Sequence, residues 1–112
     1  MVKDSTPDRG DIISLEFHPQ RGREQAGRRP ALVLSPRAYN GKVGLAIVCP
    51  ITHQTKGYPF EVALPRNLKT KGVILSDHVK SLDWRARGSR IIEKVPTTVL
   101  TEVLGKLELL FA

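Results

Sequence analysis

The chain has little of what several classes of protein depend on. It holds a single cysteine, Cys49, in 112 residues, so no disulfide can form within it, as is usual for a reducing cytosol. Cys49 lies in the apolar run 45–49, and we expect its thiol to be buried and unreactive. No apolar run approaches the roughly 18 residues of a membrane-spanning helix, and the polar N-terminus lacks a signal-peptide pattern. We therefore expect a cytoplasmic protein with no membrane partner.

Motifs of metal and nucleotide sites are also missing. His18, His53 and His78 lie far apart in the sequence, and none has the spacing of a zinc motif. The chain contains no GxxxxGK[ST] phosphate loop, no GxGxxG fingerprint and no GxSxG nucleophile turn. We therefore expect neither a metal nor any other cofactor.

Aromatic side chains are scarce, at 5% of the residues. Proteins that read single-stranded RNA stack bases on aromatic or guanidinium planes, so Phe17, Tyr58 and Trp84 are the available platforms. Phe17 ends an apolar run directly before an arginine-rich loop, which places it at the rim of any site there. Trp84 is expected instead to pack in the core or in a dimer interface.

Positive charge is what the chain has in excess. Lys and Arg number 18 against 11 Asp and Glu, which gives a net charge of +7. Such an excess favours an anionic partner: a nucleic acid, an acidic membrane face or an acidic protein. With 40% hydrophobic and 26% charged residues, the composition is that of a soluble globular protein, and the length predicts one domain over residues 1–112.

Short apolar runs separated by Gly and Pro predict a mainly β fold. The expected strands are 11–17, 31–35, 43–50, 60–64, 72–75, 78–84 and 91–95. Residues 36–41, which include Asn40 and Gly41, are expected to form a turn or a single helical turn. Strands this short and closely spaced indicate a small barrel of about six or seven antiparallel strands.

The last segment has a helical period instead. One face of a helix beginning near Pro96 would carry the apolar stripe Leu100, Val103, Leu104, Leu107 and Phe111. Thr97 or Thr98 could cap this helix. The stripe is expected to pack on the core rather than to bind a partner.

The arginine-rich loop 22–30 (GREQAGRRP) lies between the first two strands. Guanidinium groups match phosphate oxygens in pairs, so this loop suits a phosphate-bearing ligand. Glu24 is a candidate general base, and Arg28 and Arg29 are candidate charge stabilisers. The alternative is an exposed cluster of salt bridges, which would contribute little to stability.

RNA can be cleaved at such a site without a metal, because the ribose 2′-OH is its own nucleophile. Glu24 would take the proton of that hydroxyl, and Arg29 would stabilise the charge that grows on the phosphate. Thr52, directly after a strand, could donate to a phosphate oxygen or only bond its own backbone in a turn. The proton donor to the 5′ oxygen stays open between Arg29, His53 and water. The guanidinium of an arginine stays protonated in proteins, which makes it a poor proton shuttle.

Further cations are spread along the chain. A groove that follows an RNA strand could be lined by Lys56, Lys80, Arg85, Arg87 and Arg90, unless these residues are merely solvated. The loop 65–71 is also basic, with Arg66, Lys69 and Lys71.

Four blocks, in order, resemble the MazF/PemK family of toxin endoribonucleases: 22–30 (GREQAGRRP), 33–36 (VLSP), 50–62 (PITHQTKGYPFEV) and 77–87 (DHVKSLDWRAR). The resemblance runs from about Gly10 to the terminal segment. It implies an SH3-like, CcdB-related barrel that forms a homodimer, with single-stranded RNA in a groove at the dimer interface. It also implies ribosome-independent cleavage of mRNA at a short sequence, which leaves a 2′,3′-cyclic phosphate and a 5′-hydroxyl, and an acidic antitoxin that covers the same basic surface.

Carried over by position, the family's catalytic arginine falls on Arg29, its threonine on Thr52 and its glutamate on Glu24. The expected RNA-binding residues are Phe17, Gln25, Arg28, His53, Gln54, Lys56, His78, Lys80, Arg85 and Arg87. His53 and His78 depart from the family pattern, which has a hydroxyl or small residue and an amide there, so the cleavage sequence is open. Two other functions stay in view: a non-enzymatic topoisomerase poison of the CcdB type, and a barrel that binds nucleic acid without cutting it.

Overall fold

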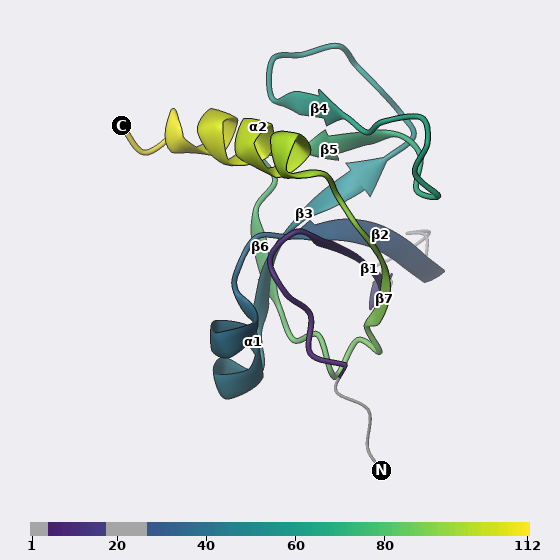
Figure 1. Ribbon diagram of the computed structural model, residues 1–112, viewed down its shortest axis with the longest axis vertical. Coiled ribbons are helices and arrows are strands. Elements are labelled where there is room, and N and C mark those ends of the chain that lie inside the picture. The colour runs from purple at the N-terminus through teal and green to yellow at the C-terminus, as the bar shows by residue number, and fades with distance from the viewer. Residues whose placement is uncertain (1–4, 18–26) are drawn as a thin grey trace, which may run out of the picture.

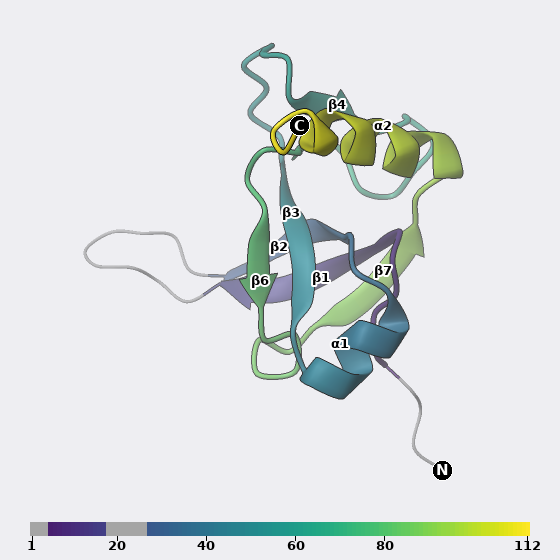
Figure 2. The ribbon, with the colours of Figure 1, turned by 90° about the vertical axis from the view of Figure 1, so that its left-hand side faces the viewer.

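The chain folds as a mainly β structure with two helices in the described residues. The computed structural model describes residues 5–17 and 27–112. The strands are β1 (Asp11–Phe17), β2 (Gly27–Val33), β3 (Ala46–Thr52), β4 (Glu61–Ala63), β5 (Val73–Leu75), β6 (Lys80–Leu82) and β7 (Arg90–Lys94), and the helices are α1 (Arg37–Val43) and α2 (Thr97–Glu108). The two helices lie toward opposite ends of the molecule (Figures 1 and 2). The predicted mainly β fold with a C-terminal helix is confirmed.

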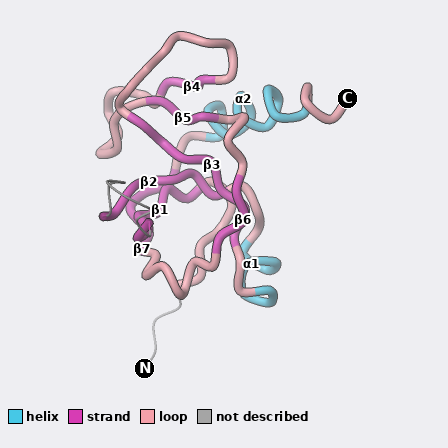
Figure 3. Tube along the Cα trace, turned by 180° about the vertical axis from the view of Figure 1, so that it is seen from behind, coloured by secondary structure: helices cyan, strands magenta, loops and turns pink. Residues whose placement is uncertain are grey.

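Strand β3 organises the seven-stranded sheet, whose order is β4-β5-β3-β2-β1-β7 with β6 paired to β3. Along one edge β3 pairs antiparallel with β2. Along its other edge the first residues pair with β6 and the last two, Ile51 and Thr52, pair with β5. Seen from behind, β3 runs from the β6 and α1 end toward the β4–β5 pair (Figure 3). Residues 76–79, which connect β5 to β6, therefore lie beside the middle of β3.

Several predicted boundaries are wrong by a few residues. Strand β2 begins at Gly27, within the arginine-rich loop, so Arg28 and Arg29 belong to a strand. Residues 37–43 form a helix of nearly two turns rather than one, and Gly44 ends it in the left-handed region at φ 84°. Val43, predicted to open a strand, is the last residue of that helix, and β3 starts at Ala46.

The core lies on both faces of the central strands, because neighbouring residues of a strand point to opposite faces. Ile12, Leu32 and Cys49 belong to one buried cluster, which α2 covers with Val99 and Val103. The other cluster contains Ile13, Leu15, Ala31, Val33, Ala46, Val48 and Trp84. Trp84 is thus a core residue, one of the two places predicted for it.

The predicted apolar stripe of α2 is only partly buried. Val103 is buried and Leu100 and Leu107 pack against the core, whereas Leu104 is 36% and Phe111 79% exposed. The predicted threonine cap is wrong, because Pro96 occupies the N-cap position and the helix has no side-chain cap.

Asn40, which the sequence pattern places in a turn, is a buried polar residue at the centre of several hydrogen bonds. It is fully buried and its amide donates to the carbonyls of Pro7 and Ser35, each at 2.9 Å. Its own carbonyl accepts the indole N–H of Trp84 at 2.9 Å. Because each buried polar atom of this group has a partner, Asn40 fastens α1 to the core.

Candidate functional site

The register of β2 and β3 brings Arg29 toward Thr52. Ala31 pairs with Pro50, and continuing this register by two residues sets Arg29 opposite Thr52. Both residues line one open cleft of about 460 Å³, together with Arg28, Pro30, Ile51, His53 and Gln54. Arg29 and Thr52 thus share one cleft, and their catalytic roles stay predictions.

The two neighbouring arginines have different surroundings. The guanidinium of Arg28 donates from Nε to Ser14 Oγ and from Nη2 to Ser14 O, both at 2.8 Å, and also to Gly88 O. Its Nη1 lies 4.0 Å from the carboxylate of Glu16. Arg29 is exposed and makes no side-chain hydrogen bond or ion pair within the described residues. Arg28 thus ties β1 and β2 to the turn at Gly88, whereas the donors of Arg29 have no partner in the part of the chain that the structure describes.

Thr52 fits both of its predicted roles at once. Its Oγ1 accepts the backbone N–H of Gln54 at 3.1 Å, which fixes the turn that leaves β3. A hydroxyl that accepts one hydrogen bond still has its proton to donate. Next to it, His53 is exposed in the same cleft.

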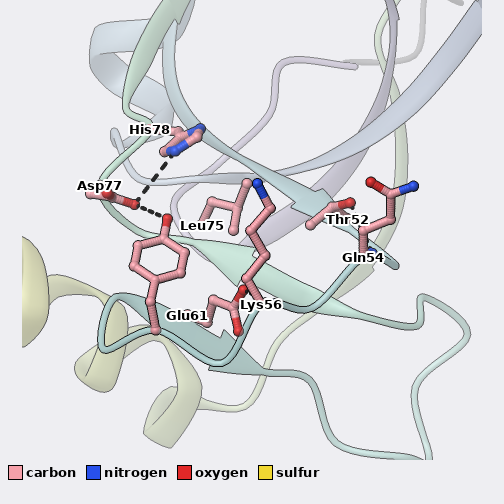
Figure 4. Close-up of a pocket in the computed structure, with 8 residues that line it drawn as sticks. Thr52, Gln54, Lys56, Glu61, Leu75, Asp77 and His78 are labelled. Atoms are coloured by element: carbon pink, nitrogen blue, oxygen red, sulfur yellow. Dashed lines mark hydrogen bonds and ion pairs between the residues drawn. The ribbon is translucent and has the colours of Figure 1, made fainter.

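A second pocket, of about 430 Å³, adjoins the first and shares Thr52 and Gln54 with it. Its other lining residues are Lys56, Tyr58, Glu61, Leu75, Asp77 and His78. In Figure 4 the side chain of Lys56 lies between Thr52 and the Asp77–His78 pair. The two pockets together form a continuous groove that passes the end of β3.

Asp77 links two side chains of this pocket, Tyr58 and His78. Tyr58 Oη donates to Asp77 Oδ1 at 2.5 Å, and His78 Nε2 lies 3.8 Å from the same oxygen. The hydrogen bond to Asp77, aided by desolvation, raises the pKa of Tyr58 to about 12. Sequence reasoning missed Asp77 as a site residue, because no local pattern links it to Tyr58.

Glu61 holds the 53–60 loop in shape. Its carboxylate accepts the backbone N–H groups of Lys56 at 2.7 Å and Gly57 at 2.9 Å and the hydroxyl of Thr55 at 3.1 Å. These hydrogen bonds, led by that from Lys56, lower the pKa of Glu61. The loop that carries Gln54 and Lys56 is thus preorganised.

The remaining predicted residues lie outside these two clefts. Lys80 is exposed on β6, and Arg85 stacks on Trp84 with its guanidinium carbon 4.6 Å from the ring centre. Arg87 donates to Glu16 O at 3.3 Å, and Phe17 packs partly against the Trp84 cluster. The structure thus does not bring these four into the groove. Glu24 and Gln25 lie outside the described residues.

Other chemistries find no support in the part of the chain that the structure describes. No group of three or more His, Cys, Asp or Glu there could hold a metal ion. Cys49 is buried, and burial raises the pKa of its thiol to about 12, as the predicted unreactive thiol requires. Among the same residues, no helix is long and apolar enough to cross a membrane.

Comparison with known proteins agrees with this geometry. Residues 8–111 match the family described as "PemK-like, MazF-like toxin of type II toxin-antitoxin system". The chain belongs to this PemK/MazF toxin family. The endoribonuclease toxin MazF of Escherichia coli K12 is 54% identical over 89 residues, which cover 80% of this chain and 79% of that protein. Endoribonuclease PemK of Escherichia coli is 38% identical over 109 residues, covering 92% of this chain and 80% of PemK.

Solved structures of MazF from Deinococcus radiodurans share the fold. A MazE–MazF complex (Form-II) contains a chain with a TM-score of 0.92 and 56% identity, and the match covers 96% of this chain and 97% of that one. MazF alone (Form-I) gives a TM-score of 0.87 with 56% identity, at 96% and 98% coverage. The resemblance that the sequence blocks indicated is therefore confirmed at the level of family and fold.

Proposed function

We propose that this PemK/MazF family member is a cytoplasmic endoribonuclease toxin that cleaves single-stranded mRNA at a short sequence, without a ribosome or a metal ion. One observation carries the proposal: the guanidinium of Arg29, which has no partner among the described residues, and the hydroxyl of Thr52 line the same open cleft. The names of its relatives, endoribonucleases at 54% and 38% identity, support the same reaction class.

The chemistry needs only groups of the chain and of the RNA. The ribose 2′-oxygen attacks the adjacent phosphorus, the bond from phosphorus to the 5′ oxygen breaks, and the products are a 2′,3′-cyclic phosphate and a 5′-hydroxyl. Arg29 stabilises the negative charge that grows on the non-bridging oxygens, and Thr52 donates its proton to one of them. Both act in the transition state, where added charge makes such donors count most.

Two proton transfers complete the reaction. The resemblance assigns Glu24 as the base that takes the 2′-OH proton. The leaving 5′ oxygen needs a proton in return, and His53, exposed in the same cleft, carries an imidazole, the side chain that serves most often as a general acid or base. We therefore favour His53 over Arg29 as the donor, with water as the alternative.

The adjoining pocket suits a nucleobase next to the scissile linkage. Its walls combine an aromatic ring, Tyr58, with a cation, Lys56, and polar groups of Gln54, Asp77 and His78. An unstacked base can lie against such a ring and have its edge read by hydrogen bonds. This pocket is the proposed source of sequence specificity.

The proposed partners follow from charge and from the relatives. MazF of Deinococcus radiodurans has been solved with MazE, and we propose that this chain likewise binds an acidic antitoxin, over the cations of the groove. We also propose a homodimer, as the resemblance implies. Leu109, Leu110 and Phe111, which are 69%, 50% and 79% exposed, are available for burial against another chain.

The test is incubation of the purified protein with a long single-stranded RNA in EDTA. We expect discrete fragments with cyclic phosphate ends. Arg29→Ala should lower the cleavage rate at saturating RNA by about 10²-fold or more, because it removes one transition-state donor, and should keep most of the RNA affinity, because many cations share that task.

Arg37→Ala, on α1 and away from the groove, is the matched control and should cleave at the wild-type rate. Wild-type cleavage by Arg29→Ala would contradict the site assignment. Intact RNA that is nevertheless retarded on a gel would indicate a binding protein, and intact RNA with inhibited gyrase would indicate a topoisomerase poison.

A further inference from the structure

The loop between β4 and β5 carries cations that the proposed mechanism does not use. Lys69, Thr70 and Lys71 line a cleft of about 250 Å³ whose other walls are Ser14, Arg28, Arg29, Pro30, His53 and Ile92. This cleft shares Arg28, Arg29, Pro30 and His53 with the Arg29–Thr52 cleft, and it shares no lining residue with the Tyr58–Asp77–His78 pocket. The groove therefore continues past Arg29 on the side away from the proposed base pocket.

Glu93 of β7 holds this loop in place through hydrogen bonds to Lys69 and Thr70. Its Oε1 accepts the backbone N–H of Lys69 at 3.0 Å, and its Oε2 accepts both the N–H and the hydroxyl of Thr70 at 2.7 Å. Desolvation alone would raise the pKa of Glu93, yet the hydrogen bonds from Thr70 and Lys69 outweigh it and lower the pKa. The carboxylate of Glu93 thus stays charged, and both of its oxygens accept hydrogen bonds from the loop.

A second anchor joins the loop directly to Thr52. Gly72 follows Lys71 with φ +116°, and a Cβ at this position would clash with the carbonyl oxygen of Thr52. The next residue, Val73, pairs with Thr52 in the sheet. The loop backbone is therefore held against the strand end that carries the candidate catalytic hydroxyl.

The charges that face this cleft are mostly positive. Lys69 is exposed, and Lys71 donates from Nζ to Arg66 O at 2.6 Å, which leaves two of its three N–H groups for a ligand. Arg29 is unpaired within the described residues. Of the nearby carboxylates, Glu93 is bonded to the loop and Glu16 lies beside Arg28.

We propose that Lys69, Thr70 and Lys71 form a phosphate subsite, which binds the RNA backbone beyond the scissile linkage. The proposal rests on the proposed function and extends its groove by at least one nucleotide. Ammonium groups bind phosphate as point charges and do not read the base. The subsite therefore adds affinity and salt dependence without adding sequence preference, and it acts on binding rather than on the chemical step.

The test compares Lys69→Gln/Lys71→Gln with Arg37→Gln/Lys42→Gln, which removes the same charge from exposed positions of α1. Binding is measured to an RNA that has a 2′-deoxy sugar at the cleavage position and so cannot be cut. Each phosphate contact on a single strand contributes about 0.7 to the slope of log K against log salt. We expect the loop variant to lower that slope by about 0.7 if both lysines bind one phosphate and by about 1.4 if they bind two, and the α1 variant to leave it near wild type.

Kinetics on a cleavable RNA give the second readout. The loop variant should raise KM about tenfold with kcat within about twofold of wild type. Shortening the RNA from one end should abolish this difference, and shortening it from the other should not. An unchanged slope and KM would overturn the proposal, and so would a difference that survives shortening from both ends, since that would be a general field effect.

This outcome is separable from the fate of the proposed function. If the two double variants differ in salt slope but the wild-type protein never cuts RNA, the nuclease proposal is refuted and the phosphate subsite stands. If the wild-type protein cuts RNA and the two variants bind and cleave it identically, the phosphate subsite is refuted and the nuclease proposal stands.

Discussion

At the scale of single residues, sequence neighbours differ in what their side chains are free to do. Arg28 and Arg29 are adjacent and chemically identical. Arg28 nevertheless donates hydrogen bonds to Ser14 and Gly88, whereas the side chain of Arg29 donates none to the described residues. The pleat of β2 sends the two side chains to opposite faces. The two candidate charge stabilisers therefore separate into Arg28, which bonds within the fold, and Arg29, for which we propose a role in ligand binding.

This separation predicts opposite effects of two alanine substitutions. Arg28→Ala should lower the free energy of unfolding by about 2 kcal/mol, because it leaves two partly buried acceptors of Ser14 without their donor. Arg29→Ala should change stability by less than about 0.5 kcal/mol, as is usual for an exposed residue without partners. Urea denaturation of both variants measures this, and equal losses would contradict the assignment.

At the scale of elements, the site depends on loops that carboxylates hold in place. Glu61 fixes the 53–60 loop, and Glu93 fixes the β4–β5 loop, each by accepting backbone N–H groups. Such clamps reduce the ordering entropy that RNA binding would otherwise cost. The sequence pattern marks both segments only as polar loops.

Two glycines give an element-scale test of how the sheet supports the site. Gly72→Ala should destabilise the protein by about 2 kcal/mol or more, because an L residue is strained at its positive φ and its Cβ would meet the Thr52 backbone. Gly105→Ala, in α2 with nothing within 4 Å of the added Cβ, should stabilise it by about 0.5–1 kcal/mol.

Thermal unfolding and cleavage rates of both glycine variants give the answer. Cleavage should fall in Gly72→Ala, because the strand end that carries Thr52 must shift, and should not change in Gly105→Ala. A stable and fully active Gly72→Ala would show that the loop is not held against Thr52.

At the scale of the whole molecule, charge bears on which partners we propose and on how stability depends on pH. The net charge of +7 suits RNA and an acidic antitoxin alike. Asp8, Glu61 and Glu93 all have lowered pKa values. A carboxyl group with a lower pKa in the folded state contributes stability above its unfolded value, and this contribution is lost as the pH falls through the folded value.

Acid should therefore destabilise this protein below the ordinary carboxyl values of 3.8 for Asp and 4.5 for Glu. Glu93→Gln should lower the melting temperature at pH 7, and its difference from wild type should shrink as the pH falls from about 5 toward 3. Melting curves across this range measure it. A difference that grows in acid would contradict the direction of the pKa shift.

The sequence was sufficient for the fold class, because alternation, Gly and Pro breaks and a final helical period are local signals. It was less reliable where a local signal had a tertiary use. Asn40 followed by Gly41 reads as a turn, yet Asn40 is a buried hub whose partners include Pro7 and Trp84. Val43 reads as strand but ends a helix, because Gly44 caps that helix directly after it in the left-handed conformation.

The sequence by itself determined the family, the strand and helix content and the basic charge, and it marked Arg29 and Thr52 as candidate site residues. Only the tertiary structure decided that Arg29 and Thr52 share a cleft and that Arg28, not Arg29, bonds to other described residues. It also decided that Tyr58 bonds Asp77 across 19 residues and that Thr70 bonds Glu93 across 23. The physical reason is range. Periodicity and residue type act between near neighbours, whereas a hydrogen bond between distant segments exists only after the sheet has brought them together.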